Sequence, residues 1–250
     1  LAAVVVAVAA NASNLYHTYT YSKESMRGKS ELAAAGQSKS SGLSKEYITQ
    51  WSYGIGETWT LLVPNAKGGA SVPLSENKTA MKKANPEFMQ VYQQLGQYWG
   101  DQPMTSGPVY VGAFVLMLFI LGLFIVKGPM KWALLAATIL SIMLSWGKNF
   151  MGLTDFFIDY VPMYSKFRTV ASILVIAEFT IPLLAMLALK EVVSTKPDGS
   201  PVHPPKTLMK PFLVSFLLTG GMALLFALMP QVFFDRFVSA DEMQALHQLP

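Results

Sequence analysis

Four long apolar segments constrain this chain more than any other feature of its sequence. They are residues 109–126, 132–146, 169–189 and 211–229. A helix needs about 20 mostly apolar residues to cross the hydrocarbon layer, because each residue rises about 1.5 Å through a layer about 30 Å thick. We therefore expect four transmembrane helices, the last with Pro211 at its start, where a missing N–H costs nothing.

The composition supports a membrane protein and excludes several kinds of site. Of the 250 residues, 52% are hydrophobic and only 14% are charged, whereas an ordinary soluble domain has about 25% charged residues. The sequence has no cysteine, which removes disulfide scaffolds, thiol catalysis and cysteine-ligated metals. His17, His203 and His247 are too scattered to suggest a metal site. We expect neither a metal nor a cofactor.

Both ends of the sequence are abrupt. Residues 1–11 are as apolar as the four spans but too short to cross, and they lack the charged flank and cleavage pattern of a signal peptide. We interpret them as a truncated transmembrane helix. Residues 230–250 are a polar stretch after the last span. The chain is therefore expected to be an internal fragment of a longer polytopic protein.

Lysine and arginine set the expected orientation, because short loops rich in them stay on the cytoplasmic side. The loop 127–131 has two lysines and no acid, and the loop 190–210 has four lysines against two acids. Both loops are placed inside, so residues 12–108, 147–168 and 230–250 lie outside. The basic residues thus mark topology, and no nucleic-acid partner is expected.

The outer region 12–108 is long and rich in aromatic residues, which disordered segments lack. We expect part of it to fold, with a helix at the membrane interface over residues 47–63 and a short helix over residues 85–96. The fold class expected is all-α: a polytopic transmembrane helical protein with a large, partly helical extracytoplasmic loop.

The loop between the second and third spans allows two interpretations. Asp155 and Asp159 are four residues apart and share one face of a helix that lies along the outer surface. In the first interpretation this helix is an amphipathic connector with solvated acids. In the second it is the polar floor of a substrate site, where Lys148, Lys166 and Arg168 neutralise a phosphate.

Glu178 also leaves two interpretations open, because an ionised carboxylate inside a span is costly. It serves as a proton or ion site in a transporter, or it is a neutral, hydrogen-bonded residue that holds helices together. Gly220 and Gly221 favour close packing between helices.

Three longer phrases of the sequence resemble one known family. They are WSYGIGETWTLLVPNAKGGAS (51–71), YWGDQPMTSGPVYVGA (98–113) and SWGKNFMGLTDFFIDYVPMYSKFRTVAS (145–172). Together they resemble the YfhO family of bacterial membrane proteins, multi-span proteins of the cytoplasmic membrane that are similar to GT-C glycosyltransferases. The resemblance implies transfer of a sugar from a polyprenyl-phosphate carrier to a cell-envelope polymer on the outer face of the membrane.

The same resemblance implies a set of substrate-binding residues on the outer face. They fall within the matching phrases and are Glu57, Asn65, Asp101, Lys148, Tyr164 and Arg168. Such a transfer needs a carboxylate base and cations for the departing phosphate. The family's acid lies in an outer loop upstream of this chain, so no catalytic residue is assigned and the fragment alone is expected to be inactive.

Two other classes of function stay open. One is a transporter or flippase for a lipid-linked or small substrate, with Glu178 as its intramembrane acid. The other is a non-enzymatic envelope scaffold whose outer loop binds a protein partner. The scaffold predicts an exposed aromatic patch on that loop, whereas the transferase predicts aromatic residues that line a groove.

Overall fold

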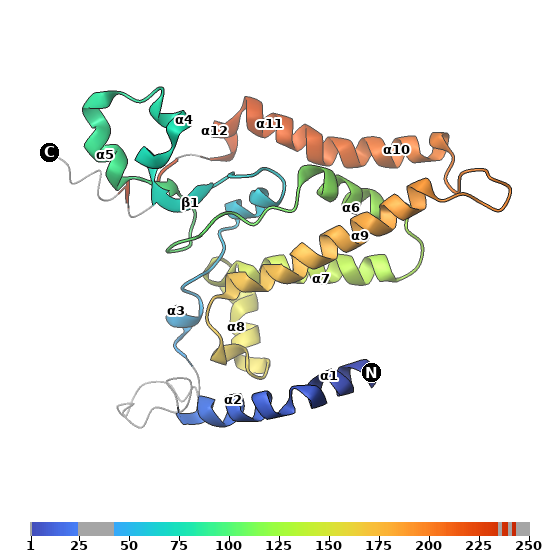
Figure 1. Cartoon of the computed structure of the whole chain (residues 1–250), viewed down its shortest axis with the longest axis horizontal. Helices are drawn as coiled ribbons and strands as arrows, with labels where there is room; N and C mark the ends of the chain where they lie inside the picture. The colour runs from blue at the N-terminus through green and yellow to red at the C-terminus, as the bar shows by residue number, and fades with distance from the viewer. Residues whose placement is uncertain (1, 25–42, 235–236, 240–241, 244–250) are drawn as a thin grey trace.

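The computed structural model describes residues 2–24, 43–234, 237–239 and 242–243, and most of them are helical. Helical segments lie side by side in a bundle (Figure 1). They are α6 (Ala113–Ile125), α7 (Met130–Ser145), α9 (Val175–Val193), and a run of α10 (Pro205–Phe216), the π-helical turn η7 (Leu217–Gly221) and α11 (Met222–Leu228). α9 packs against both α6 and α7, and α10 packs against α6.

Two helical segments of the bundle are long and apolar enough to cross a membrane. They are Val170–Val193 and Pro205–Leu228, with 24 residues each. They lie where the sequence predicted the spans 169–189 and 211–229. The prediction that Pro211 starts the last helix is wrong: Pro205 takes the first turn, where proline has no N–H bond to lose, and Pro211 lies inside α10.

The other two expected spans are not straight crossings of full length. In 109–126 the helix α6 has only 13 residues, because it begins after Gly112, whose φ of +100° is not helical. In 132–146 the helix α7 has 16 residues and is followed at once by a helical segment bent away by 110°. By length, α7 counts as a span only together with this bent segment.

The approach of α6 to α9 depends on a glycine. A side-chain carbon at Gly122 would lie 2.9 Å from Cγ of Leu184 and 3.1 Å from the Leu184 carbonyl oxygen. Hydroxyl groups join α7 to α9, since the Thr138 and Thr180 hydroxyls are 2.7 Å apart and both side chains are buried. Small residues and hydroxyl pairs of this kind favour helix association in apolar surroundings.

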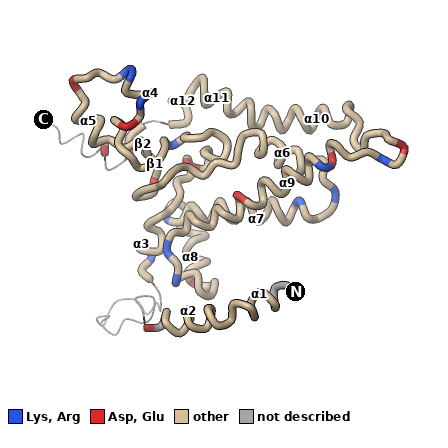
Figure 2. The backbone as a smooth tube through the Cα atoms, viewed as in Figure 1, with Lys and Arg blue, Asp and Glu red and all other residues tan. Residues whose placement is uncertain are grey.

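The two ends of the bundle differ in what they carry. One end has the loops 126–129 and 194–204, which join α6 to α7 and α9 to α10 (Figure 1). Lysines gather at this end, and few charged residues lie along the helices themselves (Figure 2). The opposite end carries most of the chain between residues 43 and 112 and the segment that follows α7.

The region between residues 43 and 112 is only partly helical. It contains α3 (Lys45–Ile48), η1 (Gly56–Leu61), β1 (Gly68–Pro73), η2 (Leu74–Glu76), α4 (Lys78–Met81), η3 (Pro86–Phe88), α5 (Met89–Gln94) and β2 (Gly96–Tyr98). β1 pairs antiparallel with β2, with Gly68 opposite Tyr98. The structure is mostly helical, as expected, but the all-α prediction did not include this two-stranded sheet. Gly68, at φ +83°, permits this pairing because a side chain there would overlap the Gln97 carbonyl.

The helix expected over residues 47–63 is wrong as a single element. α3 and η1 are two short pieces, and the backbone between them bonds to other parts of the molecule. The Tyr53 N–H, for example, donates to the Ser145 carbonyl at 2.8 Å. The short helix expected over residues 85–96 is confirmed, as η3 followed by α5.

Further helical segments surround the bundle. They are α1 (Ala2–Ala10), α2 (Ala12–Glu24), η4 (Gly147–Phe150), α8 (Met151–Tyr160), η5 (Tyr164–Lys166), η6 (Val170–Leu174) and α12 (Pro230–Phe233). Helix therefore extends well past residue 11, where the truncated span was expected to end. α8 confirms the helix predicted to carry Asp155 and Asp159.

Candidate functional site

The candidate site lies where three segments meet at the end of the bundle that carries the sheet. These segments are residues 51–57, 98–102 and 146–149. The Asn149 side-chain amide joins all three, because it donates to the Tyr53 carbonyl at 3.0 Å and to Asp101 Oδ2 at 3.1 Å. The turn after α7 is thereby fixed against the region before α6.

Glu57 is the buried carboxyl group at the centre of these segments, with 2% of its surface exposed. It accepts hydrogen bonds from the Gly54 N–H and the Tyr98 hydroxyl, both at 2.5 Å, and from the Asp101 N–H at 3.2 Å. Burial raises the pKa of Glu57, the three donors lower it in part, and the charge of Asp101 raises it. Glu57 therefore ties the turn around Asp101 to η1.

Asp101 presents the exposed carboxylate of the site. Its carbonyl oxygen accepts a hydrogen bond from Lys148 Nζ at 3.3 Å, while its side chain is held by Asn149. The Lys148 N–H donates to Ser52 Oγ at 2.8 Å, which fixes the backbone of that lysine. A carboxylate, an amide and an ammonium group are thus held together by local contacts.

Two glycines leave room for this arrangement. A side-chain carbon at Gly54 would lie 2.8 Å from Asp101 Oδ2 and 2.9 Å from Glu57 Oε2. One at Gly100 would overlap both the Tyr98 hydroxyl and Glu57 Oε1. Both positions require glycine for space, because the two carboxyl groups and the phenol fill the volume that a side chain would take.

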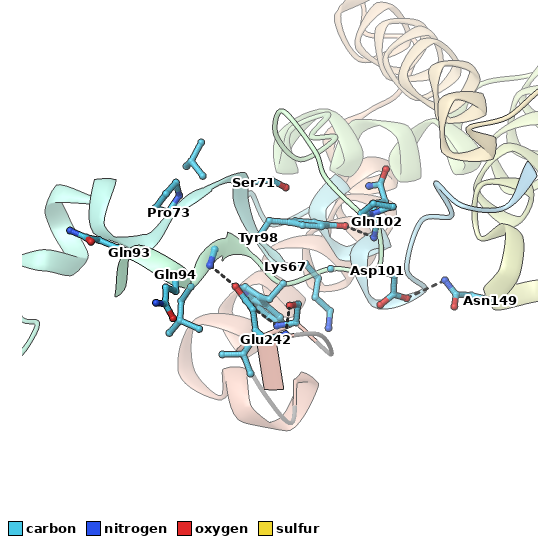
Figure 3. A pocket seen from close by; sticks show the side chains of 18 of the residues that line it. Lys67, Ser71, Pro73, Gln93, Gln94, Tyr98, Asp101, Gln102, Asn149 and Glu242 are labelled. Atoms are coloured by element: carbon cyan, nitrogen blue, oxygen red, sulfur yellow. Dashed lines mark hydrogen bonds between the residues drawn. The ribbon is translucent and has the colours of Figure 1, made fainter. Parts of the chain in front are cut away.

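Two of these segments, 98–102 and 146–149, contribute to the lining of a cavity of about 750 Å³, whereas residues 51–57 do not line it (Figure 3). Its polar and aromatic lining consists of Lys67, Lys148, Asp101, Glu242, Ser71, Ser239, Gln93, Gln94, Gln102, Asn149, Tyr98 and Trp99. Lys67 Nζ lies 4.6 Å from the centre of the Trp99 ring and 4.8 Å from that of Phe234. Two cations, two carboxyl groups, several amides and aromatic rings suit a ligand that has hydroxyl groups and an anionic group.

The phenol of Tyr98 connects the cavity wall to the buried carboxyl. It donates to Glu57 and accepts from the Gln102 N–H at 2.9 Å, a contact drawn in Figure 3. Burial raises the pKa of Tyr98, and the neighbouring charge of Glu57 raises it further. On another side of the cavity, Glu242 accepts a hydrogen bond from the Gly96 N–H.

The structure brings together three of the six residues selected from the sequence: Glu57, Asp101 and Lys148. Asn65 lies in the turn before β1, with φ +60°, and lines a smaller hollow that shares Trp99 with the cavity. Tyr164 lies elsewhere, with its ring 5.5 Å from that of Phe157; burial raises its pKa.

The basic residues expected to surround one phosphate line different parts of the surface. Lys166 borders a separate hollow beside α8. The Arg168 guanidinium lies 4.9 Å from the ring centre of Tyr47 and 4.6 Å from that of Trp51, and it donates to the Tyr47 hydroxyl at 2.5 Å. Of the three, only Lys148 lines the cavity.

Several residues of the cavity were not predicted from the sequence. Lys67 and Trp99 fall within or beside the quoted phrases, but nothing in their spacing indicates that one packs over the other. Asn149 follows Lys148 directly, and its role depends on the turn after α7. Only the pairing of β1 with β2 brings Lys67 and Trp99 together, since the Trp99 N–H donates to the Lys67 carbonyl at 3.1 Å.

Glu178 and the glycine pair lie away from the cavity. Glu178 is exposed on the first turn of α9, eight residues into the apolar segment Val170–Val193 and not at its centre. Gly220 and Gly221 lie in η7. A side-chain carbon at Gly220 would meet the Phe216 ring of the same helical run, and one at Gly221 would meet nothing within 4 Å. Close packing between helices therefore does not explain this pair.

Comparisons with known proteins leave the site to be interpreted from its own geometry. No family model, curated protein or solved structure matches the chain. Within the ranges that the structure describes, no group of three or more histidine, aspartate or glutamate side chains could hold a metal ion.

Proposed function

We propose that this chain carries the outer substrate site of a multi-span bacterial membrane protein, one that transfers a sugar from a polyprenyl-phosphate carrier to a cell-envelope polymer. The observation that carries this proposal is the cavity, where the cations Lys67 and Lys148 and the carboxylate of Asp101 line one space with aromatic rings and amides. This combination supports recognition of a sugar and of a phosphate at the same site.

The chemistry of sugar transfer explains why these groups occur together. The acceptor oxygen forms a bond to the anomeric carbon, and the bond to the carrier phosphate breaks, with the electron pair leaving on the phosphate. Lys67 and Lys148 stabilise the charge that develops there. Asp101 accepts a hydrogen bond from a sugar or acceptor hydroxyl. The carboxylate that removes the proton is expected upstream of this chain, as the resemblance to the YfhO family implies.

The arrangement of the helices supports an outer location for the cavity. Val170–Val193 runs away from the cavity end of the bundle and Pro205–Leu228 returns to it. The loop that joins them lies at the opposite end and carries Lys196, with Lys190 and Lys206 beside it. Because lysine-rich short loops stay in the cytoplasm, we place this loop inside and the cavity on the outer face of the cytoplasmic membrane.

A lipid-linked donor requires the site to lie close to the apolar layer. The Phe226 ring in α11 lies 5.1 Å from Trp59 in η1 and 4.0 Å from Phe233 in α12. The next residue, Phe234, contacts both Trp99 and Lys67 of the cavity wall. An apolar contact path therefore joins the end of a candidate span to the cavity, as the isoprenoid chain of such a donor needs.

The proposal is tested in membranes that contain the full-length protein and are supplied with radiolabelled polyprenyl-phosphate sugars. We expect Asp101→Asn and Lys148→Ala each to lower incorporation of label into envelope polymer by about 100-fold, the scale at which charged groups of a transfer site act. Matched controls are Asp198→Asn and Lys82→Ala, which change exposed residues outside the cavity and should leave incorporation unchanged.

The variant Arg168→Ala tests whether the phosphate binds in the cavity or beside Arg168, which lies over the rings of Tyr47 and Trp51. We expect a smaller loss than for Lys148→Ala, because Arg168 does not line the cavity. Loss of label in Arg168→Ala with full activity in Asp101→Asn and Lys148→Ala would assign the phosphate to the Tyr47 side and overturn the cavity site. Absence of label with every donor would overturn sugar transfer itself.

A further inference from the structure

The chain turns sharply between α7 and α8, and specific contacts fix this corner. Gly147 has φ +44°, and a side-chain carbon there would overlap Ser52 Oγ. Thr154 of α8 is fully buried and donates to the Gly147 carbonyl at 2.9 Å. The direction of α8 is therefore determined by the fold and not by the composition of the loop.

The corner sends α8 across the direction of the bundle. α7 and the helical segment after it differ in direction by 110°, so α8 runs close to the membrane plane when α7 runs along the membrane normal. Figure 1 shows α8 leaving the ends of α7 and α9 at the same end of the bundle as α3. Trp146 lies at the corner, as an aromatic residue does at the boundary between lipid and water.

α8 has a polar side and an exposed aromatic side. On the polar side, Asp155 accepts a hydrogen bond from Lys45 of α3 at 2.5 Å, and Asp159 lies one turn further on. On the adjoining side, Phe156 is 54% exposed and Tyr160 is 74% exposed, with their ring centres 5.2 Å apart. Two large aromatic side chains four residues apart form one continuous apolar strip.

We propose that α8 is a membrane-surface helix, with the strip of Phe156 and Tyr160 seated in the outer leaflet of the bilayer. The bilayer is the occupant that fits, because α8 leaves the bundle at the end where α7 ends and α9 begins and runs at 110° to α7 (Figure 1). Amphipathic helices bind lipid surfaces with an apolar face of this kind. This inference rests on the membrane location in the proposed function, but it does not depend on sugar transfer.

The 250-residue sequence contains no cysteine, and any cysteine elsewhere in the full-length protein is first replaced by serine. Single variants Phe156→Cys and Tyr160→Cys carry a nitroxide label in the full-length protein in phosphatidylcholine–phosphatidylglycerol vesicles. Power saturation compares collisions with oxygen, which enters the bilayer, and with a water-soluble nickel chelate. Lys82→Cys, outside the bundle, serves as the water control, and Phe179→Cys, 67% exposed on α9, serves as the lipid control.

We expect both α8 labels to be at least threefold less accessible to nickel than Lys82→Cys, with an oxygen accessibility between the two controls. Nickel accessibility equal to that of Lys82→Cys would overturn the inference, as would protection from both reagents, which indicates a protein partner. If Phe179→Cys is itself exposed to nickel, the membrane location fails and not only the role of α8.

The unsubstituted protein gives a second measurement that is free of folding defects in the variants. A phospholipid with a diazirine at headgroup level is photolysed in the same vesicles, and the peptide that contains Phe156 and Tyr160 is analysed for adducts. Adducts on this peptide support the inference. Their absence, while peptides of α9 and α10 are labelled by a probe at the chain end, overturns it.

Discussion

At the scale of single residues, the site depends on a carboxyl group that is expensive to bury. Glu57 offsets this cost with three donors, two of them backbone N–H groups that the turn at Gly54 and Asp101 aims inward. A buried acceptor without such partners would cost about 1–3 kcal/mol. Glu57 is therefore a positioning residue, because it holds Asp101 toward the cavity without lining the cavity itself.

The raised pKa of Glu57 predicts how stability depends on pH. The folded state favours the protonated carboxyl, so the stabilisation is fully present below the unfolded-state pKa and is lost as pH rises through the folded-state pKa. We expect Glu57→Gln to reduce the fall in Tm between pH 4 and pH 8, about the range above the ordinary carboxyl pKa. Thermal unfolding in detergent measures this difference.

The matched control for that prediction is Glu76→Gln, which changes an exposed glutamate of η2. Its Tm should follow the wild-type pH profile. Glutamine fits at position 57, since one oxygen can accept from both N–H groups while the amide nitrogen donates to the Tyr98 oxygen. A pH profile of Glu57→Gln identical to that of the wild type would contradict the raised pKa.

A side chain at Gly100 is expected to destabilise the fold by a steric clash. Gly100→Ala places a methyl group where the Tyr98 hydroxyl and Glu57 Oε1 now lie, and overpacking of this kind costs about 1–3 kcal/mol. We expect a lower Tm and loss of sugar transfer. Gly152→Ala in α8, where a side-chain carbon meets nothing within 4 Å, should keep or raise the Tm, because alanine favours helix by about 1 kcal/mol over glycine.

At the scale of elements, the packing of α6 and α7 on α9 depends on small and hydroxyl-bearing residues at facing positions of these helices. The apolar runs predicted helices at nearly the right places, but their lengths followed local backbone features. Gly112 delays the start of α6, and Pro205 takes the start of α10 that Pro211 was expected to take. Apolarity alone does not report such boundaries, because it is high on both sides of Gly112 and low on both sides of Pro205.

The packing of α6 on α9 gives an element-scale prediction. Gly122→Ala should lower the free energy of unfolding by about 1–3 kcal/mol, because the new methyl group meets Leu184 at 2.9 Å. The double variant with Leu184→Ala should lose less free energy of unfolding than the sum of the two single losses, because the smaller side chain makes room for the new methyl group. Chemical denaturation in detergent measures all three variants, and strictly additive losses would show that the contact is not tight.

At the scale of the whole molecule, the lysine-rich loops at one end of the bundle predict the orientation of the protein in the membrane. In intact spheroplasts, a membrane-impermeant maleimide should label Lys82→Cys without lysis, and it should label Asp198→Cys only after lysis. The reason is that the loop 194–204 and α4, which ends directly before residue 82, lie at opposite ends of the bundle (Figure 1). The reverse pattern would place the cavity in the cytoplasm and exclude a polyprenyl-phosphate donor on the outer face.

Apolar helices with lysines at one end could be predicted from the sequence, because hydropathy and charge are properties of each segment alone. Six candidate site residues were predicted from the sequence, and three of them, Glu57, Asp101 and Lys148, lie together in the structure. That Asp101 and Lys148 line one cavity with Lys67 and Trp99, that Glu57 is buried against Asp101, and that Arg168 lies apart all depend on the tertiary structure. Hydrogen bonds between residues about 40 to 100 positions apart, such as those of Asn149, decide this, and no local pattern encodes them.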